Sequence, residues 1–377
     1  MTTHAVRVEI AGAAVTIQSE EQYVTDWCDR YFGTWWKMTK ADGRDVGTGA
    51  EVTAKVSTRD YDDIAHTVSR APHTTASYGG GQILIARDVS EGVIRAVQTR
   101  DAVAYWSRPA WPEVDIVGCH AEDAAMATAR VARDVIRGQL LRANWSVLHA
   151  SAVVQDGRTI LTLGKKGAGK TSTALALATR HGLGLLSNDR VFVRPDRSGG
   201  VEVLPWPSAA AVGLGLMDAL GWIDVAREWL DAGEVLHPTQ DSRVTKALRE
   251  GGRTALWDGP KELKVQVFPD QFTSWFGVPL ATEGRVAAVV FPRIARSAAP
   301  ALEDTARTVS ESDFLFARTE DRYPDVFGLV GEGFGAPRHE VARRLDRLPH
   351  YTVVLGHDVQ ANADFLSKLT DSVERKT

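Results

Sequence analysis

Cysteine is scarce in this sequence. Its 377 residues contain only Cys28 and Cys119, which form no CxxC pair. A zinc site built on thiolates is therefore not expected, because such sites need paired, closely spaced cysteines. A single disulfide between them is compatible with the sequence, but two isolated cysteines in a chain of this length are more typical of a reduced, cytosolic protein.

Long apolar runs are absent as well. Stretches such as 286–291 are far shorter than the roughly 20 residues that a membrane-spanning helix needs. The N-terminal residues MTTHAVRVEI contain neither the basic nor the apolar region of a signal peptide. We therefore expect a soluble, cytoplasmic protein without a membrane partner.

The chain has no strong excess of either charge. Lys and Arg number 44 and Asp and Glu number 48, which gives a formal net charge of −4. A general nucleic-acid binder normally carries a basic excess, so we expect no nucleic-acid partner. The composition, 44% apolar and 24% charged, is that of a globular protein. A chain of this length can bury a core without disulfides or metals.

Strand and turn patterns dominate residues 1–120. The segment 5–17 alternates loosely around Gly12 and predicts a β-hairpin. Further short strands are expected at 51–56, at 82–85 and on both sides of 99–101. The segment 73–81 has the composition of a turn or loop. The aromatic stretch 27–36 is a candidate recognition surface, although packing in a core is the simpler explanation. We predict a strand-rich α+β N-terminal domain that supplies substrate recognition.

A helical pattern separates this region from the rest. Residues 121–144 carry apolar residues at helical spacing, acids in the first turn and arginines near the end, so we place a linking helix here. Short apolar runs without clean alternation follow, and these are typical of strands covered on both faces. They lie at 147–154, 159–163, 184–186 and 287–291. A helical pattern at 171–180 completes a β-α-β unit, which predicts an α/β domain over 145–377.

A glycine-rich motif follows the apolar run at 159–163. Residues 164–171 read Gly-Lys-Lys-Gly-Ala-Gly-Lys-Thr and satisfy the P-loop pattern GxxxxGK[ST] in full. Its fixed positions match by chance in about one chain in a hundred of this length. The strand pattern before it and the helical pattern after it are the context that a P-loop needs. The alternative is a glycine-rich turn that binds nothing.

The residue types in this motif suit a nucleoside triphosphate. Glycines let the backbone approach phosphate groups closely, and the loop N–H groups and the helix N-terminus present positive potential. Lys170 would contact the β- and γ-phosphates, and the Thr171 hydroxyl would ligate Mg²⁺. The predicted contacts to ATP or GTP are Gly164, Gly167, Ala168, Gly169, Lys170, Thr171 and Ser172.

Two further polar residues stand at strand ends near this motif. Asp189 follows a short apolar strand, where it could ligate Mg²⁺, directly or through water, or accept a hydroxyl proton. An Asn-Asp turn after a strand is also common without any function. His149 begins the strand before the motif and could orient a carboxylate or shuttle a proton, although such a histidine is often just a satisfied polar residue.

Two large classes of nucleotide-dependent protein are disfavoured. The late strand 287–291 ends in Pro292-Arg293 rather than in aspartate, which argues against ordinary motor or transport ATPases. The HRD and DFG elements of eukaryotic-type protein kinases are absent from the sequence.

Taken together, three segments resemble the HPr kinase/phosphorylase-like family. They read His149-Ala-Ser-Ala-Val, Gly164-Lys-Lys-Gly-Ala-Gly-Lys-Thr and Leu185-Leu-Ser-Asn-Asp-Arg-Val. The family includes the HPr serine kinase and related kinases of lasso-peptide and other natural-product gene clusters. The resemblance covers 145–195 well, extends weakly to the C-terminus and is not convincing over 1–140. It implies catalytic roles for Lys170, His149 and Asp189, with Thr171 and Asp189 at the metal.

The chain departs from that family at Asn188. Members usually have two consecutive acids here, and an asparagine can orient a hydroxyl or ligate a metal but cannot take a proton. The signature segment associated with the phosphorylase reaction is also missing, so we do not expect that back-reaction. A cation for the transferred phosphoryl group must come from elsewhere. The candidates are Arg190, Lys261, Lys264 and Arg293.

These observations predict a Mg²⁺-dependent kinase. It would transfer the γ-phosphoryl group of ATP or GTP to a hydroxyl on a peptide or protein side chain or on a small metabolite. One alternative is a nucleotide-binding regulatory or assembly protein with weak or no phosphotransfer, which Asn188 favours. Another is a small-molecule kinase unrelated to the HPr kinase group, against which the spacing of His149 speaks. Family members often form hexamers or dimers, so a homo-oligomer stays open.

Overall fold

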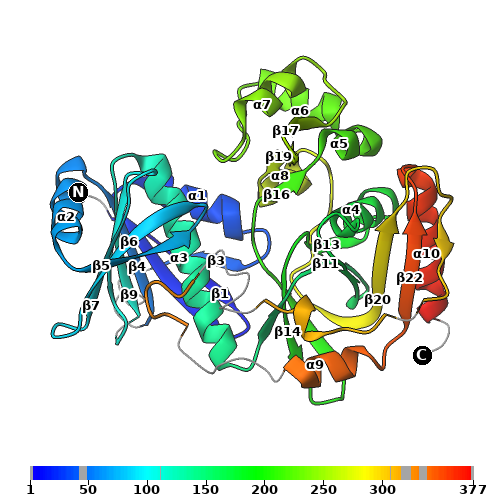
Figure 1. Cartoon of the computed structure of the whole chain (residues 1–377), viewed down its shortest axis with the longest axis horizontal. Coiled ribbons are helices and arrows are strands. Elements are labelled where there is room, and N and C mark those ends of the chain that lie inside the picture. The colour runs from blue at the N-terminus through cyan, green and yellow to red at the C-terminus, as the bar shows by residue number, and fades with distance from the viewer. Residues whose placement is uncertain are drawn as a thin grey trace. The chain divides into compact units, whose positions relative to one another are not determined.

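The chain folds into two compact units. A computed structural model describes residues 3–41, 49–110, 112–305, 307–315, 324–330 and 338–374. Unit 1 comprises Met1–Trp145 and Leu315–Gly335, and unit 2 comprises Ser146–Phe314 and Ala336–Thr377 (Figure 1). The predicted domain limits, 1–120 and 145–377 with a linking helix between them, stay a prediction. In the structure that helix, α3 (Ala121–Arg142), is part of unit 1.

Unit 1 is built on one large sheet. Its strands are β1 (His4–Ile10), β2 (Ala13–Ser19), β3 (Lys37–Lys40), β4 (Glu51–Val56), β5 (His73–Tyr78), β6 (Gly81–Asp88), β7 (Val93–Gln98), β8 (Val103–Arg108) and β9 (Glu113–Gly118). Within the described residues they are ordered β3-β1-β2-β4-β9-β8-β7-β6-β5. The pairs β2–β4 and β4–β9 are parallel, and the others are antiparallel. The predicted hairpin over 5–17 is confirmed, as are the strands at 51–56 and on both sides of 99–101.

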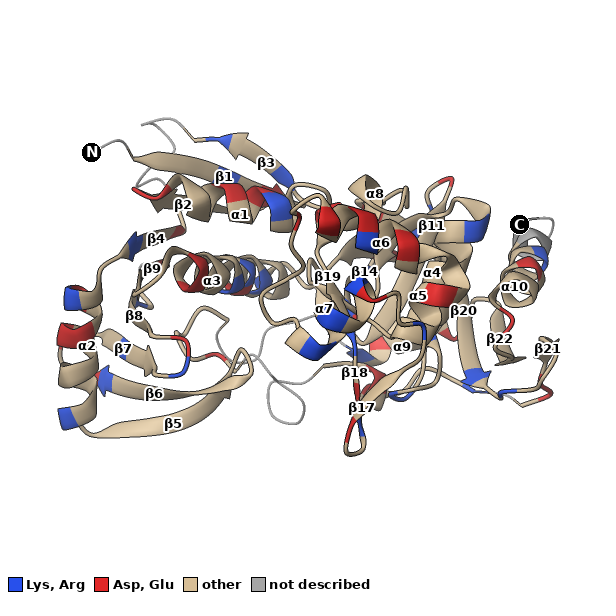
Figure 2. Ribbon diagram, turned by 90° about the horizontal axis from the view of Figure 1, so that it is seen from above, with Lys and Arg blue, Asp and Glu red and all other residues tan. Residues whose placement is uncertain are grey.

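Helices cover both faces of this sheet. Helix α2 (Thr58–Arg70) packs through Val68 on Ala104, whereas Tyr105, the next residue of β8, lies on the opposite face beside Tyr78. That face carries α3, because the Tyr78 hydroxyl donates a hydrogen bond of 2.9 Å to Asp134. Helix α1 (Gln22–Phe32) packs on α3. Figure 2 shows that α3 begins with acidic residues and continues with basic ones.

One expectation for unit 1 is corrected and another is decided. Residues 73–81 were expected to form a turn or loop, but β5 pairs with β6 along its whole length. The glycine turn signal belongs only to Gly79 and Gly80, which have φ of +58° and +90°. The aromatic stretch 27–36 packs in the core, as the simpler explanation predicted, since Trp27, Trp35 and Trp36 are buried.

Unit 2 contains a second large sheet. Its strands are β10 (Ser146–Leu148), β11 (Ala150–Gln155), β12 (Arg158–Leu163), β13 (Gly184–Ser187), β14 (Val191–Pro195), β15 (Val201–Pro205), β20 (Gly284–Ile294), β21 (Ala301–Leu302) and β22 (His350–Leu355). The order is β10-β14-β15-β20-β12-β11-β13, and β22 also pairs with β20. The pairs β12–β20 and β20–β22 are parallel. Helices α4 (Lys170–His181) and α10 (Val359–Glu374) pack together, and α4 covers β11.

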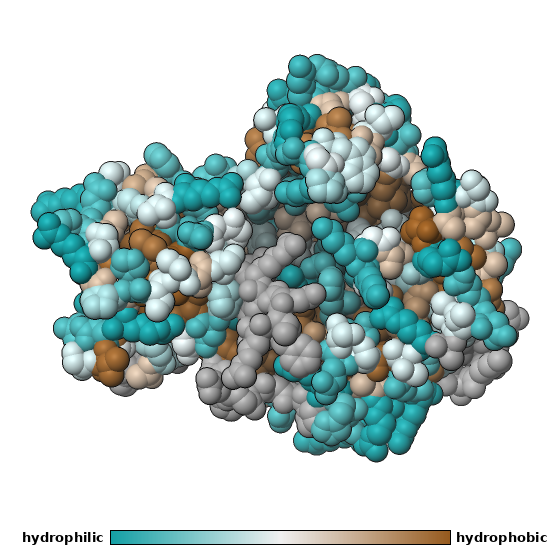
Figure 3. Space-filling view, in the orientation of Figure 1, coloured by the Kyte–Doolittle hydropathy of each residue, from teal (hydrophilic) through white to brown (hydrophobic). Residues whose placement is uncertain are grey.

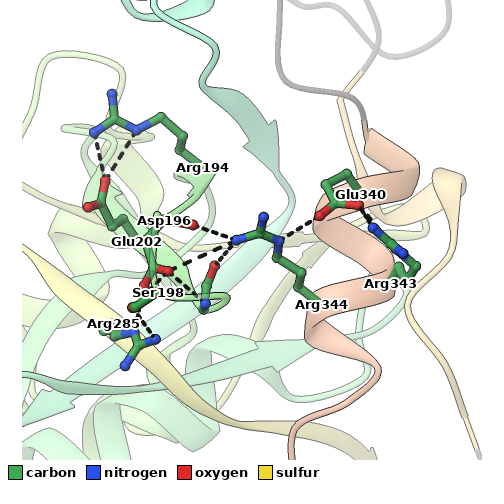
Figure 4. A network of polar contacts seen from close by, with 9 residues as sticks. Arg194, Asp196, Ser198, Glu202, Arg285, Glu340, Arg343 and Arg344 are labelled. Carbon is green, nitrogen blue, oxygen red and sulfur yellow. Dashed lines mark hydrogen bonds and ion pairs between the residues drawn. The ribbon is translucent and has the colours of Figure 1, made fainter.

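A mixed α/β architecture with two large sheets therefore agrees with the sequence at a coarse level. The face opposite α4 is covered by α9 (Arg338–Leu345), whose Val341 and Leu345 join a core with Leu161 and Val203. A polar network holds α9 on the turn between β14 and β15 (Figure 4). Arg344 Nη1 donates to the carbonyl of Asp196 at 2.6 Å, and Arg344 Nε donates to Glu340 at 2.7 Å.

A small lobe is inserted in unit 2 between β15 and β20. Its elements are β16 (Ala210–Val212), α5 (Leu214–Leu220), α6 (Trp222–Asp231), α7 (Ser242–Arg249), β17 (Leu256–Asp258), β18 (Lys261–Leu263), β19 (Val265–Val267) and α8 (Pro269–Ser274). The pairs β16–β19 and β17–β18 form two short ribbons. The face of the molecule seen in Figure 3 is mainly hydrophilic, with hydrophobic patches scattered over it.

Candidate active site

The ends of four strands of unit 2 meet at one edge of the sheet. β12 and β20 are parallel, so their carboxyl ends meet there. β11 is antiparallel to both β12 and β13, so β11 begins at this edge and β13 ends at it. Polar residues that lie far apart in the sequence are thereby collected at one place, which is where open α/β sheets commonly bind ligands.

The glycine-rich loop leaves the sheet at this edge. It connects β12 to α4, as the strand and helix patterns at 159–163 and 171–180 predicted. Gly167 and Gly169 have φ of +83° and +105°, in the region that side chains disfavour. At Gly169 a Cβ would also lie 2.7 Å from the Ile294 side chain at the end of β20, so the positive φ and this close approach both favour glycine. The loop's path therefore depends on the motif's own residues.

Lys170 is held inside this loop. Its Nζ donates a hydrogen bond of 2.7 Å to the carbonyl of Gly164, and the Lys165 carbonyl lies 3.5 Å away. The residue is only 8% exposed, so the ammonium faces the loop rather than bulk solvent. The first turn of α4 starts at the same point, because Thr173 N donates to the carbonyl of Gly169 at 2.8 Å. One edge of the sheet thus combines a buried cation with a helix N-terminus.

His149 reaches the site because the strand around it is broken. The apolar run 147–154 was expected to be one strand, but it forms β10, which pairs with β14, and β11, which pairs with β12 and β13. At the junction His149 N donates to the carbonyl of Asp313 at 2.8 Å instead of joining a ladder. The side chain then contacts Asp189, with Nε2 at 3.1 Å from Oδ1.

Asp189 stays ionised in this setting. Burial raises the pKa of its carboxyl, but the hydrogen bond from His149 and the positive charges of Arg190, His149 and Lys170 outweigh burial and lower the pKa to about 2. Because a carboxylate only accepts hydrogen bonds, His149 Nε2 must carry the proton that it shares. The Asp189 side chain is 41% exposed, so a ligand can reach it.

Asn188 links this carboxylate to the start of α4. Its carbonyl accepts hydrogen bonds from Ser151 Oγ at 2.6 Å and from Thr171 Oγ1 at 3.3 Å. The residue is 4% exposed, and its side-chain Oδ1 has no hydrogen-bond partner among the described residues. The Thr171 hydroxyl and the Asp189 carboxylate therefore belong to one connected cluster, with a buried unpaired acceptor beside them.

The oxygen atoms of this cluster could bind Mg²⁺ only together with a phosphate ligand. Over the described residues, no group of three or more His, Cys, Asp or Glu side chains could hold a metal by itself. Mg²⁺ usually keeps several waters and takes one or two protein oxygens plus phosphate oxygens. The Thr171 hydroxyl and the ionised Asp189 can supply such oxygens, and Asn188 Oδ1 is a further acceptor.

The four residues predicted as candidate cations for the transferred phosphoryl group differ in their contacts. Arg190 Nη1 lies 3.5 Å from Asp189 Oδ2, and its guanidinium lies over the Trp206 ring. Arg293 forms an ion pair with Glu303 and is largely exposed. The lysines 261 and 264 belong to or follow β18 in the inserted lobe. Arg190 is thus the one of these four for which a contact to a predicted site residue is seen within the described residues.

Sequence reasoning missed one arginine that the structure places at the loop. Arg307 Nη1 lies 3.8 Å from the position that a Cβ on Gly164 would occupy. No motif surrounds Arg307 in the sequence, so the sequence carried no signal for it. A hollow of about 600 Å³ elsewhere in unit 2 is lined by residues of the inserted lobe, such as Leu230, His237 and Lys246, and by no residue of the glycine-rich loop.

Comparison with known proteins adds little to this geometry. No family model and no curated protein matches the chain. A solved structure of the Hpr(Ser) kinase/phosphatase from Coxiella burnetii shows a distant similarity, which covers 60% of this chain and 98% of that chain at 13% sequence identity and a TM-score of 0.25. Similarity at that level carries no argument about function. Within the described residues, no helix has the length and apolar character to cross a membrane.

Proposed function

We propose that this protein is a Mg²⁺-dependent phosphotransferase that moves the γ-phosphoryl group of ATP or GTP to a hydroxyl of a peptide, protein or small molecule. The observation that carries the proposal is the meeting of two features at one edge of the unit 2 sheet. One is the glycine-rich loop with Lys170 inside it. The other is the ionised Asp189, held 3.1 Å from His149.

The loop supplies the phosphate site. Its backbone N–H groups and the first turn of α4 offer donors and positive potential to an anion. Lys170 would exchange the Gly164 carbonyl for the β- and γ-phosphate oxygens, to which an ammonium forms stronger, charge-assisted hydrogen bonds. Thr171 would hold Mg²⁺ directly and Asp189 would hold it through water, so that the carboxylate can still contact an acceptor hydroxyl, and the ion would neutralise the charge that develops on transfer.

Asp189 and His149 would handle the acceptor. In the transfer step the acceptor oxygen forms a bond to the γ-phosphorus, and the bond from that phosphorus to the β–γ bridging oxygen breaks. The bridging electron pair leaves with the nucleoside diphosphate, and the hydroxyl proton passes to Asp189. A carboxyl with a pKa of about 2 is a weak base, so Asp189 orients the hydroxyl first and takes the proton late. A loose transition state tolerates this order, because it depends mainly on positioning and charge.

A nucleotide-binding regulatory protein is the second candidate. The observations that favour it are the amide of Asn188 in place of a second carboxylate and the low pKa of Asp189. Both reduce the basicity available to an acceptor hydroxyl. Neither affects the loop, so nucleotide binding is common to both candidates and phosphoryl transfer distinguishes them.

Transfer of label from γ-labelled ATP tests the proposal. The purified chain would be incubated with Mg²⁺ and a panel of serine-, threonine- and tyrosine-containing peptides and small alcohols. We expect labelled acceptor, a loss of at least about 100-fold with Asp189→Asn, and comparable loss with Lys170→Ala. The matched control is Asp364→Asn, since Asp364 contacts His181 at the same 3.1 Å on an exposed surface. Nucleotide binding without label on any acceptor would favour the regulatory candidate instead.

A further inference from the structure

Arg307 lies on a short segment that is fixed on both sides. The Thr305 carbonyl before it accepts a hydrogen bond of 2.7 Å from the Thr352 hydroxyl. Val309 after it donates from its N–H to Asp346 at 2.9 Å, and its side chain is buried in the core of unit 2. The backbone at Arg307 is therefore anchored to β22 and to the end of α9, close to the edge where β20 ends.

The side chain is also oriented by two contacts. Its guanidinium lies 4.5 Å from the centre of the Phe291 ring, near the end of β20. Nη2 donates to Asp313 Oδ1 at 2.7 Å. Asp313 is the residue whose carbonyl accepts the N–H of His149, so one segment supports both Arg307 and His149. The arginine is thus aimed by a carboxylate and an aromatic face rather than extended into solvent.

The guanidinium lies beside the first glycine of the loop. Nη1 lies 3.8 Å from where a Gly164 Cβ would stand. Gly164 also provides the carbonyl that binds Lys170 Nζ at 2.7 Å. Two cations therefore flank a single loop residue, from the side of α4 and from the side of β20.

Arg307 retains donors for a ligand. A guanidinium has five N–H donors in a planar fork. Over the described residues, Arg307 makes a single hydrogen bond, the one to Asp313, and its side chain is 35% exposed. Nε and Nη1 are consequently available to phosphate oxygens, for which Arg has the matching bidentate geometry.

We infer that Arg307 contacts the transferred phosphoryl group and neutralises the charge on its oxygens in the transition state. This inference rests on the proposed phosphotransferase function and adds to it the cation that the four sequence candidates did not supply. The bond between the γ-phosphorus and the β–γ bridging oxygen breaks as described above. Arg307 donates hydrogen bonds to the equatorial oxygens of the transferred group and neither gains nor loses a proton.

A transition-state analogue separates this role from a structural one. Calorimetry would measure the affinity for Mg²⁺·ADP with and without aluminium fluoride, which occupies the place of the transferred group. In the wild type we expect aluminium fluoride to tighten binding. In Arg307→Ala we expect Mg²⁺·ADP affinity within about threefold of wild type, loss of the tightening, and a kcat reduced by about 10³ or more, as for other transition-state arginines. Arg307→Lys should recover part of the tightening only.

Two controls keep the experiment decisive. Arg296→Ala, at an exposed arginine in the turn after β20, should leave both affinities unchanged. Asp313→Asn keeps the guanidinium but loosens its orientation, so it should give a smaller loss of tightening than Arg307→Ala. Full tightening in Arg307→Ala, or an equal loss of ADP and analogue affinity, would overturn the role of Arg307 while leaving the proposed function intact. A wild type that does not bind Mg²⁺·ADP would instead reject the proposed function and the inference with it.

Discussion

Asp189 illustrates how neighbouring charges set the chemistry of one side chain. Its carboxyl is close to His149 and Arg190, and these charges together with Lys170 outweigh the effect of burial on its pKa. The same charges that would bind phosphate and orient an acceptor thus keep Asp189 ionised before any ligand arrives. A carboxylate that is ionised at neutral pH is suited to bind a cation or a hydroxyl donor.

The low pKa of Asp189 predicts a specific pH dependence of stability. A folded-state pKa of about 2, against an ordinary 3.8, means that ionisation stabilises the fold fully above pH 3.8 and that this contribution is lost as the pH falls toward 2. After allowance for its partial exposure we expect Asp189→Asn to lower the free energy of unfolding by about 1 kcal/mol at pH 7. Urea denaturation should show a constant difference from wild type between pH 7 and 5.

The acid range provides the check on that assignment. Below pH 3.8 the difference between wild type and Asp189→Asn should shrink. A difference that grows on acidification would show that the carboxyl is held protonated in the folded chain and would contradict the charge arrangement described here.

At the scale of residues, the sequence indicated those whose roles depend on local spacing. Gly164, Lys170 and Thr171 sit in a motif that is readable along the chain, and the resemblance paired His149 with Asp189. Arg307 could not be found in this way, since its approach to Gly164 depends on the pairing of β12, β20 and β22. The buried, unpaired Oδ1 of Asn188 is likewise a property of the packed site.

Elements were predictable where local signals agreed with their tertiary partners. The hairpin over 5–17 has its turn at Ala11 and Gly12, which both have positive φ. The apolar run 147–154 was wrongly predicted to be a single strand, because no local signal shows that the N–H of His149 bonds to the distant Asp313. The inserted lobe between β15 and β20 was not predicted, because its helices and strands are short and their apolar residues pack on one another.

The attachment of α9 gives a prediction at this scale. Arg344 is 20% exposed and donates to the carbonyls of Asp196 and Gly200 and to Glu340. We expect Arg344→Ala to lower the free energy of unfolding by about 1–3 kcal/mol, because the half-buried Asp196 and Gly200 lose a charged donor to their carbonyls. Its neighbour Arg343 is 61% exposed and pairs with Glu340.

Arg343→Ala is therefore a matched control on the same helix. It should change the free energy of unfolding by less than about 0.5 kcal/mol, as exposed ion pairs usually do. Equal effects of the two substitutions in urea denaturation would show that the network in Figure 4 does not hold α9 in place.

The whole molecule is divided in a way that a linear reading did not reveal. Unit 1 includes Leu315–Gly335, a segment that follows most of unit 2 in the sequence. Phe327 of this segment lies with its ring 5.6 Å from that of Tyr78 and 5.1 Å from that of Tyr105. Composition and periodicity can detect a boundary between neighbouring segments. The return of the chain to unit 1 at Leu315 depends instead on aromatic packing between residues more than half of the chain apart. The candidate site lies wholly within unit 2.

Binding of Mg²⁺·ATPγS, measured by isothermal titration calorimetry, tests whether the glycine-rich loop is a nucleotide site. We expect saturable binding by the wild type and an affinity lowered about 10- to 100-fold in Lys170→Ala, because charge-assisted hydrogen bonds to phosphate are lost. Lys166→Ala, at an exposed lysine of the same loop, should stay within about threefold of wild type. No binding by the wild type, or equal affinity with Lys170→Ala, would contradict the assignment of a nucleotide site to this loop.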